Sequence, residues 1–290
     1  MSKIYIKNYI KNYTNLFYRL VNNKPCPPQL GIDKLQQIDA KIPDYILPDN
    51  VKHIHISKAE FDEFEKRFDF EKVYDKHWVR YQRKVCEYLV ADKILPFSAT
   101  HSEPYVYIDA MSSSSGWASD LHQKYGINAY SVDINEPPNA GNCFIRADVT
   151  QLPFEDSSID ALSVQSGIEL LPGEGDIKFI KEAQRVLKPN GKCIILPLYL
   201  NSEFCNLYGR SYYKRKVVRD LGGAISYVRM DFDLPFTRLY DLCNLKKRLL
   251  STAEQSCWYI YIIEADDLIS LSDNRDSFIY LRYALVYEKK

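Results

Sequence analysis

The middle of the chain shows a regular order of apolar and polar positions. Short apolar, β-branched runs of strand length alternate with segments whose apolar residues recur every three to four positions. This alternation is typical of strands joined by helices in a parallel sheet. The pattern predicts strands at 105–108, 129–132, 143–145, 160–164 and 192–198, and helices at 117–125 and 175–187. We therefore expect an α/β fold.

Acidic residues stand where the first three of these strands end. The strand Tyr105–Ile108 ends on Asp109, the second ends on Asp133, and the third ends just before Asp148. Five small residues, Ser112 to Gly116, form the turn after the first strand. Ligands of open parallel sheets bind outside the carboxyl ends of the strands. The sequence therefore predicts a nucleotide-type site at this edge of the sheet.

With these acids and this turn, the segment from Tyr105 to about Leu200 resembles class I S-adenosylmethionine-dependent methyltransferases, with a type 11-like core. In that family the first strand ends in an acid followed by a glycine-rich turn, D-x-G-x-G-x-G. The second acid holds the ribose hydroxyls, and the third contacts the adenine amine. The separation of Asp109 and Asp133 by 24 residues suits the strand–turn–helix–strand unit of this family.

The resemblance implies a Rossmann-like sheet of seven strands, mostly parallel, with the last strand antiparallel. It also implies S-adenosylmethionine as the cofactor. The cofactor-binding positions that it implies are Asp109, Met111, Ser112, Ser113, Ser115, Asp133, Ile134, Asp148, Val149, Gln165 and Ser166.

The turn departs from the family pattern at its three glycines. Met111, Ser113 and Ser115 stand in their places. Glycine serves such turns by adopting positive φ and by allowing close backbone approach. Two hypotheses stay open: an active methyltransferase, and a non-catalytic relative that uses the sheet as a scaffold for partners. A nicotinamide enzyme is less well supported, because the G-x-G-x-x-G fingerprint is missing.

The acceptor side is expected past the fourth and fifth strands. Glu169 follows the fourth strand and is our candidate for the base that an oxygen acceptor needs. An insertion at about 201–235 is basic and rich in tyrosine, and such insertions cap the acceptor pocket in this family. Tyr199, Arg210 and Tyr212 are the candidate substrate-binding residues. This composition suits a saccharide or glycan precursor, or another small molecule, although a solvated helix face explains it equally well.

Residues 1–98 are expected to form an N-terminal helical extension or cap, and residues 99–290 the methyltransferase-like domain. Ser2–Val21 has helical spacing and a basic face, which suits either peripheral contact with an anionic membrane or packing on a protein surface. Ser57 and Glu60 form a capping-box pattern. A longer helix is predicted from about Asp75 to Ile94, and it carries aromatic residues towards the core or the site.

Composition indicates which kinds of partner, compartment and metal site the protein is expected to have. Lysine plus arginine and aspartate plus glutamate are equal at 38 each, so overall charge gives no case for nucleic acid. No apolar run reaches the roughly 20 residues of a membrane-spanning helix. The seven cysteines are scattered without a C-x-x-C pair, which indicates reduced thiols in a cytoplasm and no zinc site. His53 and His55 share one strand face without a third ligand nearby, so no metal is predicted.

Overall fold

The computed structural model of this chain describes residues 32–78, 80–95, 97–99, 103–138, 141–209, 212, 223–229, 237–253, 257–273 and 276–290. The amphipathic helix predicted at Ser2–Val21 lies outside these ranges. Within them, no helix has both the length and the apolar character to cross a bilayer.

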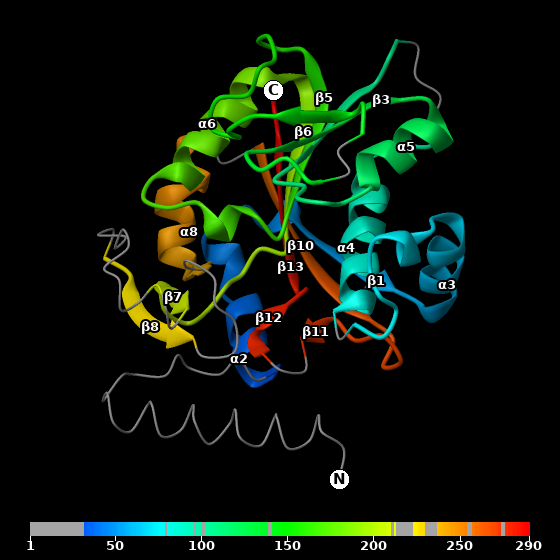
Figure 1. The fold of residues 1–290 in the computed structure, drawn as a ribbon. Coiled ribbons are helices and arrows are strands. Elements are labelled where there is room, and N and C mark those ends of the chain that lie inside the picture. The colour runs from blue at the N-terminus through cyan, green and yellow to red at the C-terminus, as the bar shows by residue number, and fades with distance from the viewer. Residues whose placement is uncertain are drawn as a thin grey trace.

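The helices and strands follow the predicted alternation (Figure 1). The α-helices are α2 (Ile32–Asp39), α3 (Lys58–Arg67), α4 (Tyr81–Ile94), α5 (Trp117–Tyr125), α6 (Gly175–Val186) and α8 (Leu242–Arg248). The strands are β1 (Val51–Ile56), β2 (Val106–Ala110), β3 (Asn128–Asp133), β4 (Phe144–Arg146), β5 (Ile159–Gln165), β6 (Leu187–Leu196), β7 (Cys205–Gly209), β8 (Ile225–Arg229), β9 (Thr237–Leu239), β10 (Trp258–Ala265), β11 (Ser272–Asp273), β12 (Asp276–Tyr280) and β13 (Tyr283–Glu288).

One large sheet organises the molecule, with strand order β1-β10-β13-β6-β5-β2-β3-β4. The run from β6 to β4 is parallel throughout, and β13 is antiparallel to both of its neighbours. The Rossmann-like sheet with an antiparallel last strand is thus confirmed. The sheet has eight strands where seven were expected, because Val51–Ile56 pairs in parallel with β10 at the edge. That strand comes from the segment predicted to be the N-terminal extension.

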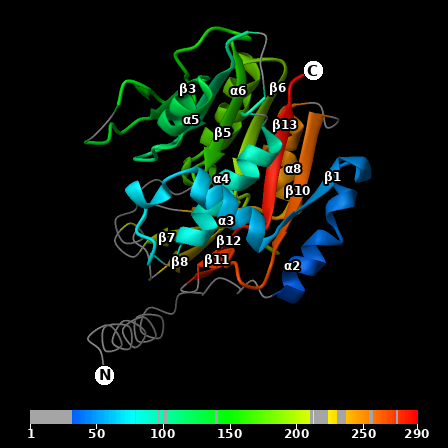
Figure 2. The ribbon, with the colours of Figure 1, turned by 90° about the vertical axis from the view of Figure 1, so that its right-hand side faces the viewer.

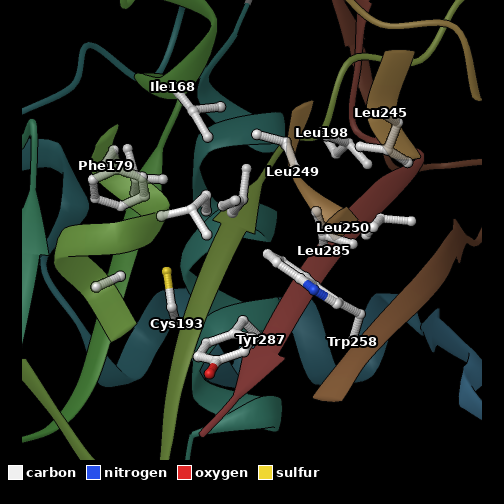
Figure 3. Packing of buried hydrophobic residues seen from close by; sticks show 14 of the residues in the cluster. Ile168, Phe179, Cys193, Leu198, Leu245, Leu249, Leu250, Trp258, Leu285 and Tyr287 are labelled. Carbon is white, nitrogen blue, oxygen red and sulfur yellow. The ribbon is translucent and has the colours of Figure 1, made fainter. Parts of the chain in front are cut away.

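Helices cover both faces of the sheet, so the core has two halves (Figures 1 and 2). On one face, α2, α6 and α8 pack on apolar side chains of β5, β6, β10 and β13. Figure 3 shows part of this half, with Trp258, Leu285 and Tyr287 of the strands facing Leu245 and Leu249. On the other face, α3, α4 and α5 enclose the second half. The strand ends between these layers are thereby held in fixed positions.

A small three-stranded sheet, β8-β7-β9, supplies the described part of the predicted insertion and its C-terminal flank. A buried ion network attaches this sheet to the core. The Asp176 carboxylate, at the start of α6, lies 2.9 Å from Nη1 of Arg238 on β9 and 2.7 Å from Nη2 of Arg248 on α8. The Tyr240 hydroxyl also donates to Asp176, at 2.7 Å. Removing one partner of such a buried network costs several kcal/mol of stability, about 3–5 kcal/mol in measured cases. The network therefore holds the three-stranded sheet firmly against the core.

One predicted helix begins later than expected. The helix predicted from Asp75 begins only at Tyr81, because the Asp75 carboxylate accepts the His77 N–H and holds a turn there. Nearer the C-terminus, Asp241 caps α8, which begins at residue 242. Strand β12 pairs with β11, whereas β13 joins the large sheet. The capping box of Ser57 is confirmed.

Candidate active site

The serine-rich turn after β2 has a backbone conformation that favours glycine at two positions. Met111 has φ of 56° and Ser113 has φ of 50°, in the left-handed region that side chains other than glycine seldom adopt. The surroundings hold this conformation: the Ser113 N–H donates to Asp133 Oδ2 at 2.9 Å, and the Ser115 N–H donates to the Ser112 carbonyl at 2.9 Å. Left-handed residues that persist in this way cluster at functional sites.

The methionine at the first glycine position is accommodated by a glycine elsewhere. Gly167 follows β5, and a Cβ atom built on it would lie 2.9 Å from both Cβ and Sδ of Met111. Ser166, beside it, is also left-handed, with φ of 57°. The two turns at the ends of β2 and β5 therefore fit each other closely.

A cavity of about 220 Å³ opens above these turns. Its lining comes from the serine-rich turn, the end of β5, α4 and the segment before α4. The lining residues are Tyr74, Lys84, Tyr88, Asp109, Met111, Ser112, Ser113, Ser114, Ser115, Gln165 and Ser166. A second cavity, of about 450 Å³, shares Ser113–Ser115 and reaches Ser131 and Pro137. The serine-rich turn is thus the wall between two cavities.

Asp109 is the buried acid of the first cavity, with 1% of its surface exposed. The Ser115 hydroxyl donates to its Oδ2 at 2.6 Å. Burial raises the pKa of Asp109 to about 6, against the hydrogen bond from Ser115 and the positive charge of Lys84. A carboxylate held in this state gains from a cationic ligand, which would restore its charge compensation.

The second and third acids lie at the expected strand ends with different surroundings. Asp133 accepts the Ser113 N–H and also the Asn135 N–H, at 2.9 Å, so it ties the turn after β2 to the turn after β3. Ile134, beside it, is 59% exposed. Asp148 is exposed and accepts the backbone N–H and the hydroxyl of Thr150, whereas Val149 packs into the core.

Gln165 and Ser166 end β5 at the cavity wall. The Gln165 side chain is 7% exposed, and among the described residues neither its amide oxygen nor its amide nitrogen has a hydrogen-bond partner. The Ser166 hydroxyl lies 3.3 Å from both carboxylate oxygens of Glu87. Buried polar atoms are normally paired, so the free Gln165 amide indicates a ligand-facing group.

A charged cluster on α4 was not predicted from the sequence. The Glu87 carboxylate is fully buried and lies 2.7 Å from the Arg83 guanidinium and 2.7 Å from the Lys84 ammonium. Arg83 also donates to the Tyr199 hydroxyl at 3.2 Å. The one local signal was the i,i+4 spacing of Arg83 and Glu87. Helix α4 therefore brings two cations and one carboxylate to the strand ends.

Glu169 lies in the short 3₁₀ helix after β5 and is buried, with its Oε2 unpaired among the described residues. Burial, aided by the charge of Glu87, raises its pKa to about 7, although its own backbone hydrogen bond and the charge of Arg83 oppose the shift. Burial likewise raises the pKa of Tyr199, which feels the charges of Arg83 and Glu169. Glu169 and Tyr199 thus belong to one electrostatic group.

The other residues predicted for the acceptor side are not brought into the cavity by the described part of the structure, except for Tyr74. Arg210 lies outside the described ranges, and Tyr212 is partly buried and is not in the lining described for the cavity. Of the aromatic residues predicted to point towards the core or the site, Tyr74 lines the cavity, while the Trp78 ring stacks on the Tyr74 ring with 5.8 Å between their centres. Across the described residues, His, Cys, Asp and Glu side chains form no group of three that could hold a metal ion.

Part of this region matches a protein family. Residues 110–195 match the family described as methyltransferase domain, of type 11. The match runs from the end of β2 to β6 and so includes the serine-rich turn, Asp133, Asp148, Gln165 and Glu169.

Curated relatives and solved structures are also similar to parts of this chain. Over 113 residues the chain is 34% identical to the ubiquinone/menaquinone biosynthesis C-methyltransferase UbiE of Rickettsia felis, covering 37% of this chain and 43% of that protein. It is 26% identical to the demethylmenaquinone methyltransferase of Mycolicibacterium gilvum, over 60% of this chain and 74% of that protein. A S-adenosylmethionine-dependent methyltransferase from Archaeoglobus fulgidus aligns with a TM-score of 0.46 at 16% identity, covering 76% and 98%. The match to the Rickettsia protein thus spans less than half of that relative.

Proposed function

We propose that the protein transfers a methyl group from S-adenosylmethionine to a small molecule, because residues 110–195 match the methyltransferase domain family. The observation that carries this proposal is the backbone of the serine-rich turn. Met111 and Ser113 adopt the left-handed conformation that glycine favours, and the turn borders a cavity with a buried acid. A turn that had lost its ligand would gain by relaxing these angles.

The residues present fit this cofactor. Asp109 offers a carboxylate to its ammonium group, and the unpaired Gln165 amide offers one donor and one acceptor. Asp133 would hold the ribose, and Asp148 the adenine amine, as the family resemblance implies. The other proposed contacts are Met111, Ser112, Ser113, Ser115, Ile134, Val149 and Ser166. When bound, the cofactor supplies a methyl group on a sulfonium, which is strongly electrophilic.

The protein's own contribution is to orient the acceptor and to take its proton. Glu169 suits the second task, because a carboxyl group with a pKa of about 7 can accept and release a proton near neutral pH. Tyr199 lies in the same buried group and would position the acceptor oxygen. We therefore assign Glu169 as the general base and Tyr199 as a substrate-binding residue.

The first acceptor class that we propose is an aromatic ring of the quinol kind. It is supported by the similarity to the ubiquinone/menaquinone biosynthesis C-methyltransferase of Rickettsia felis and to the demethylmenaquinone methyltransferase of Mycolicibacterium gilvum. A saccharide or glycan precursor is the second class. It rests on the arginines and tyrosines of the insertion at 201–235, including Arg210 and Tyr212. We also propose a reducing, cytoplasmic setting, in keeping with the free thiols of the six described cysteines.

Calorimetric titration with S-adenosylhomocysteine, the expected product, tests the cofactor directly. The wild-type protein should bind it, and Asp109→Asn should weaken binding by about tenfold or more, since a charge-assisted contact is lost. Asp156→Asn is the matched control, because Asp156 is exposed and pairs with Arg185 away from the cavity. If the wild-type protein does not bind, the scaffold hypothesis replaces this proposal.

A further inference from the structure

We propose that Lys84 binds the carboxylate of the cofactor's amino-acid end and so makes this cavity specific for an intact amino-acid tail. The inference rests on the proposed function and adds a positioning residue from outside the matched family region. Lys84 lies on α4, before residue 110, where the family match begins.

The charge pattern of the cavity fits a zwitterion. Of the described residues that line it, Asp109 and Lys84 are the charged ones, and they have opposite signs. The Lys84 charge lowers the pKa of Asp109, so the two groups lie within electrostatic range. An α-amino acid carries an ammonium and a carboxylate on the same carbon. The buried acid and the lysine can therefore compensate both charges of one ligand group.

Lys84 is held in place and still has donors to offer. Its side chain is 13% exposed, its ammonium lies 2.7 Å from Glu87 Oε2, and it stands 5.7 Å from the ring centre of Tyr88. An ammonium has three N–H donors, and Glu87 takes one of them in the described structure. Glu87 also pairs with Arg83, so one carboxylate serves two cations. An incoming carboxylate would supply the missing negative charge.

Gln165 gives independent support for a polar ligand at this place. It lines the same cavity, is more than nine-tenths buried, and has both amide atoms unpaired among the described residues. An amide left in this state costs free energy unless a ligand completes its hydrogen bonds. The cavity therefore combines an acid, a cation and an unsatisfied amide around one small volume.

The test compares two ligands that differ in the amino-acid end. S-adenosylhomocysteine has this end, and 5′-methylthioadenosine shares the nucleoside and the thioether but lacks it. Lys84→Met should weaken binding of the first by about tenfold or more and leave binding of the second unchanged, since one charge-assisted contact is removed. Lys93→Met is the matched control, because Lys93 lies on the same helix and pairs with Glu60.

The outcomes separate the two proposals. If the wild-type protein binds neither ligand, the proposed function fails and the inference falls with it. If it binds both, and Lys84→Met weakens both equally or neither, the inference is wrong while the proposed function stands. Should Lys84→Met not fold, the wild-type protein is titrated with decarboxylated S-adenosylhomocysteine. Affinity equal to that for the parent compound would overturn the role of Lys84.

Discussion

The Met111 side chain occupies the space in which a side chain on residue 167 would stand. A Cβ atom at Gly167 would lie 2.9 Å from Met111 Sδ and 2.8 Å from a Val164 methyl group. Real Cβ atoms essentially never approach this closely. The bulky residue at a glycine position of one turn is thus matched by a glycine in the neighbouring turn, and the two positions should be coupled in stability and in binding.

Gly167→Ala should destabilise the fold by about 1–3 kcal/mol, because added volume in a packed site forces side chains from their rotamers. Urea denaturation measures this directly. Gly141→Ala is the control, since a Cβ atom there meets nothing within 4 Å. Adding Met111→Ala to Gly167→Ala should recover part of the loss. Strictly additive free energies would show that Met111 and Gly167 are not coupled.

Ser113→Gly should stabilise the protein or leave it unchanged, although glycine usually destabilises. Ser113 is exposed and left-handed, so glycine relieves a strain of about 1 kcal/mol that offsets the greater freedom of the unfolded chain. Ser114→Gly is the matched comparison, because Ser114 is also exposed and is not left-handed. It should lose about 0.5–1 kcal/mol. Equal losses in the two variants would argue against strain at residue 113.

Asp133→Ala should weaken S-adenosylhomocysteine binding by more than about tenfold, since it removes a hydrogen-bonded carboxylate from the cofactor side of the turn. The structure adds a second reason, because Asp133 Oδ2 accepts the N–H of the left-handed Ser113. Calorimetric titration is the measurement, with the exposed Asp156→Ala as control. Unchanged affinity would show that Asp133 does not belong to the site.

The sequence was sufficient to predict the acids at the strand ends, the order of strands and helices from β2 to β6, and the serine-rich turn. These features are local, since each is written into a few consecutive residues. The pairing of β1 with β10 was not predictable, because paired residues such as Val51 and Ile260 lie far apart in the sequence. Periodicity gave a helix at α4 without indicating where its charges point.

The charged cluster on α4 could not be predicted from periodicity alone. Helix α4 is buried on most sides, with Arg83 and Glu87 among its buried residues. A single apolar stripe therefore does not mark the side that faces the site. Glu87 pairs with Arg83 and Lys84 on its own helix, but it also accepts from the hydroxyl of Ser166, 79 positions away, and only the packed sheet brings these two residues together. Likewise, the Met111 side chain has room because the distant residue 167 is a glycine, which its own sequence neighbours do not indicate.

The raised pKa of Glu169 makes the stability of the protein depend on pH. The pKa of Glu169 is raised from 4.5 to about 7, so between these values the folded protein holds a proton that the unfolded chain has released. The contribution of Glu169 to stability therefore falls as pH rises through this window. The pKa of Asp109 is raised from 3.8 to about 6, so the contribution of Asp109 to stability likewise falls as the pH rises between these values.

Relative to the wild type, Glu169→Gln should thus become progressively more stable from pH 4.5 to 7, and urea denaturation across this range measures the difference. The same variant tests the assignment of the base. Wild-type methyl transfer should rise with pH through about 7 as Glu169 loses its proton. Glu169→Gln should transfer slowly at every pH and lack this rise. A variant that keeps the wild-type pH profile would remove Glu169 from the reaction, whereas stability curves parallel to the wild type would show that its pKa is not raised.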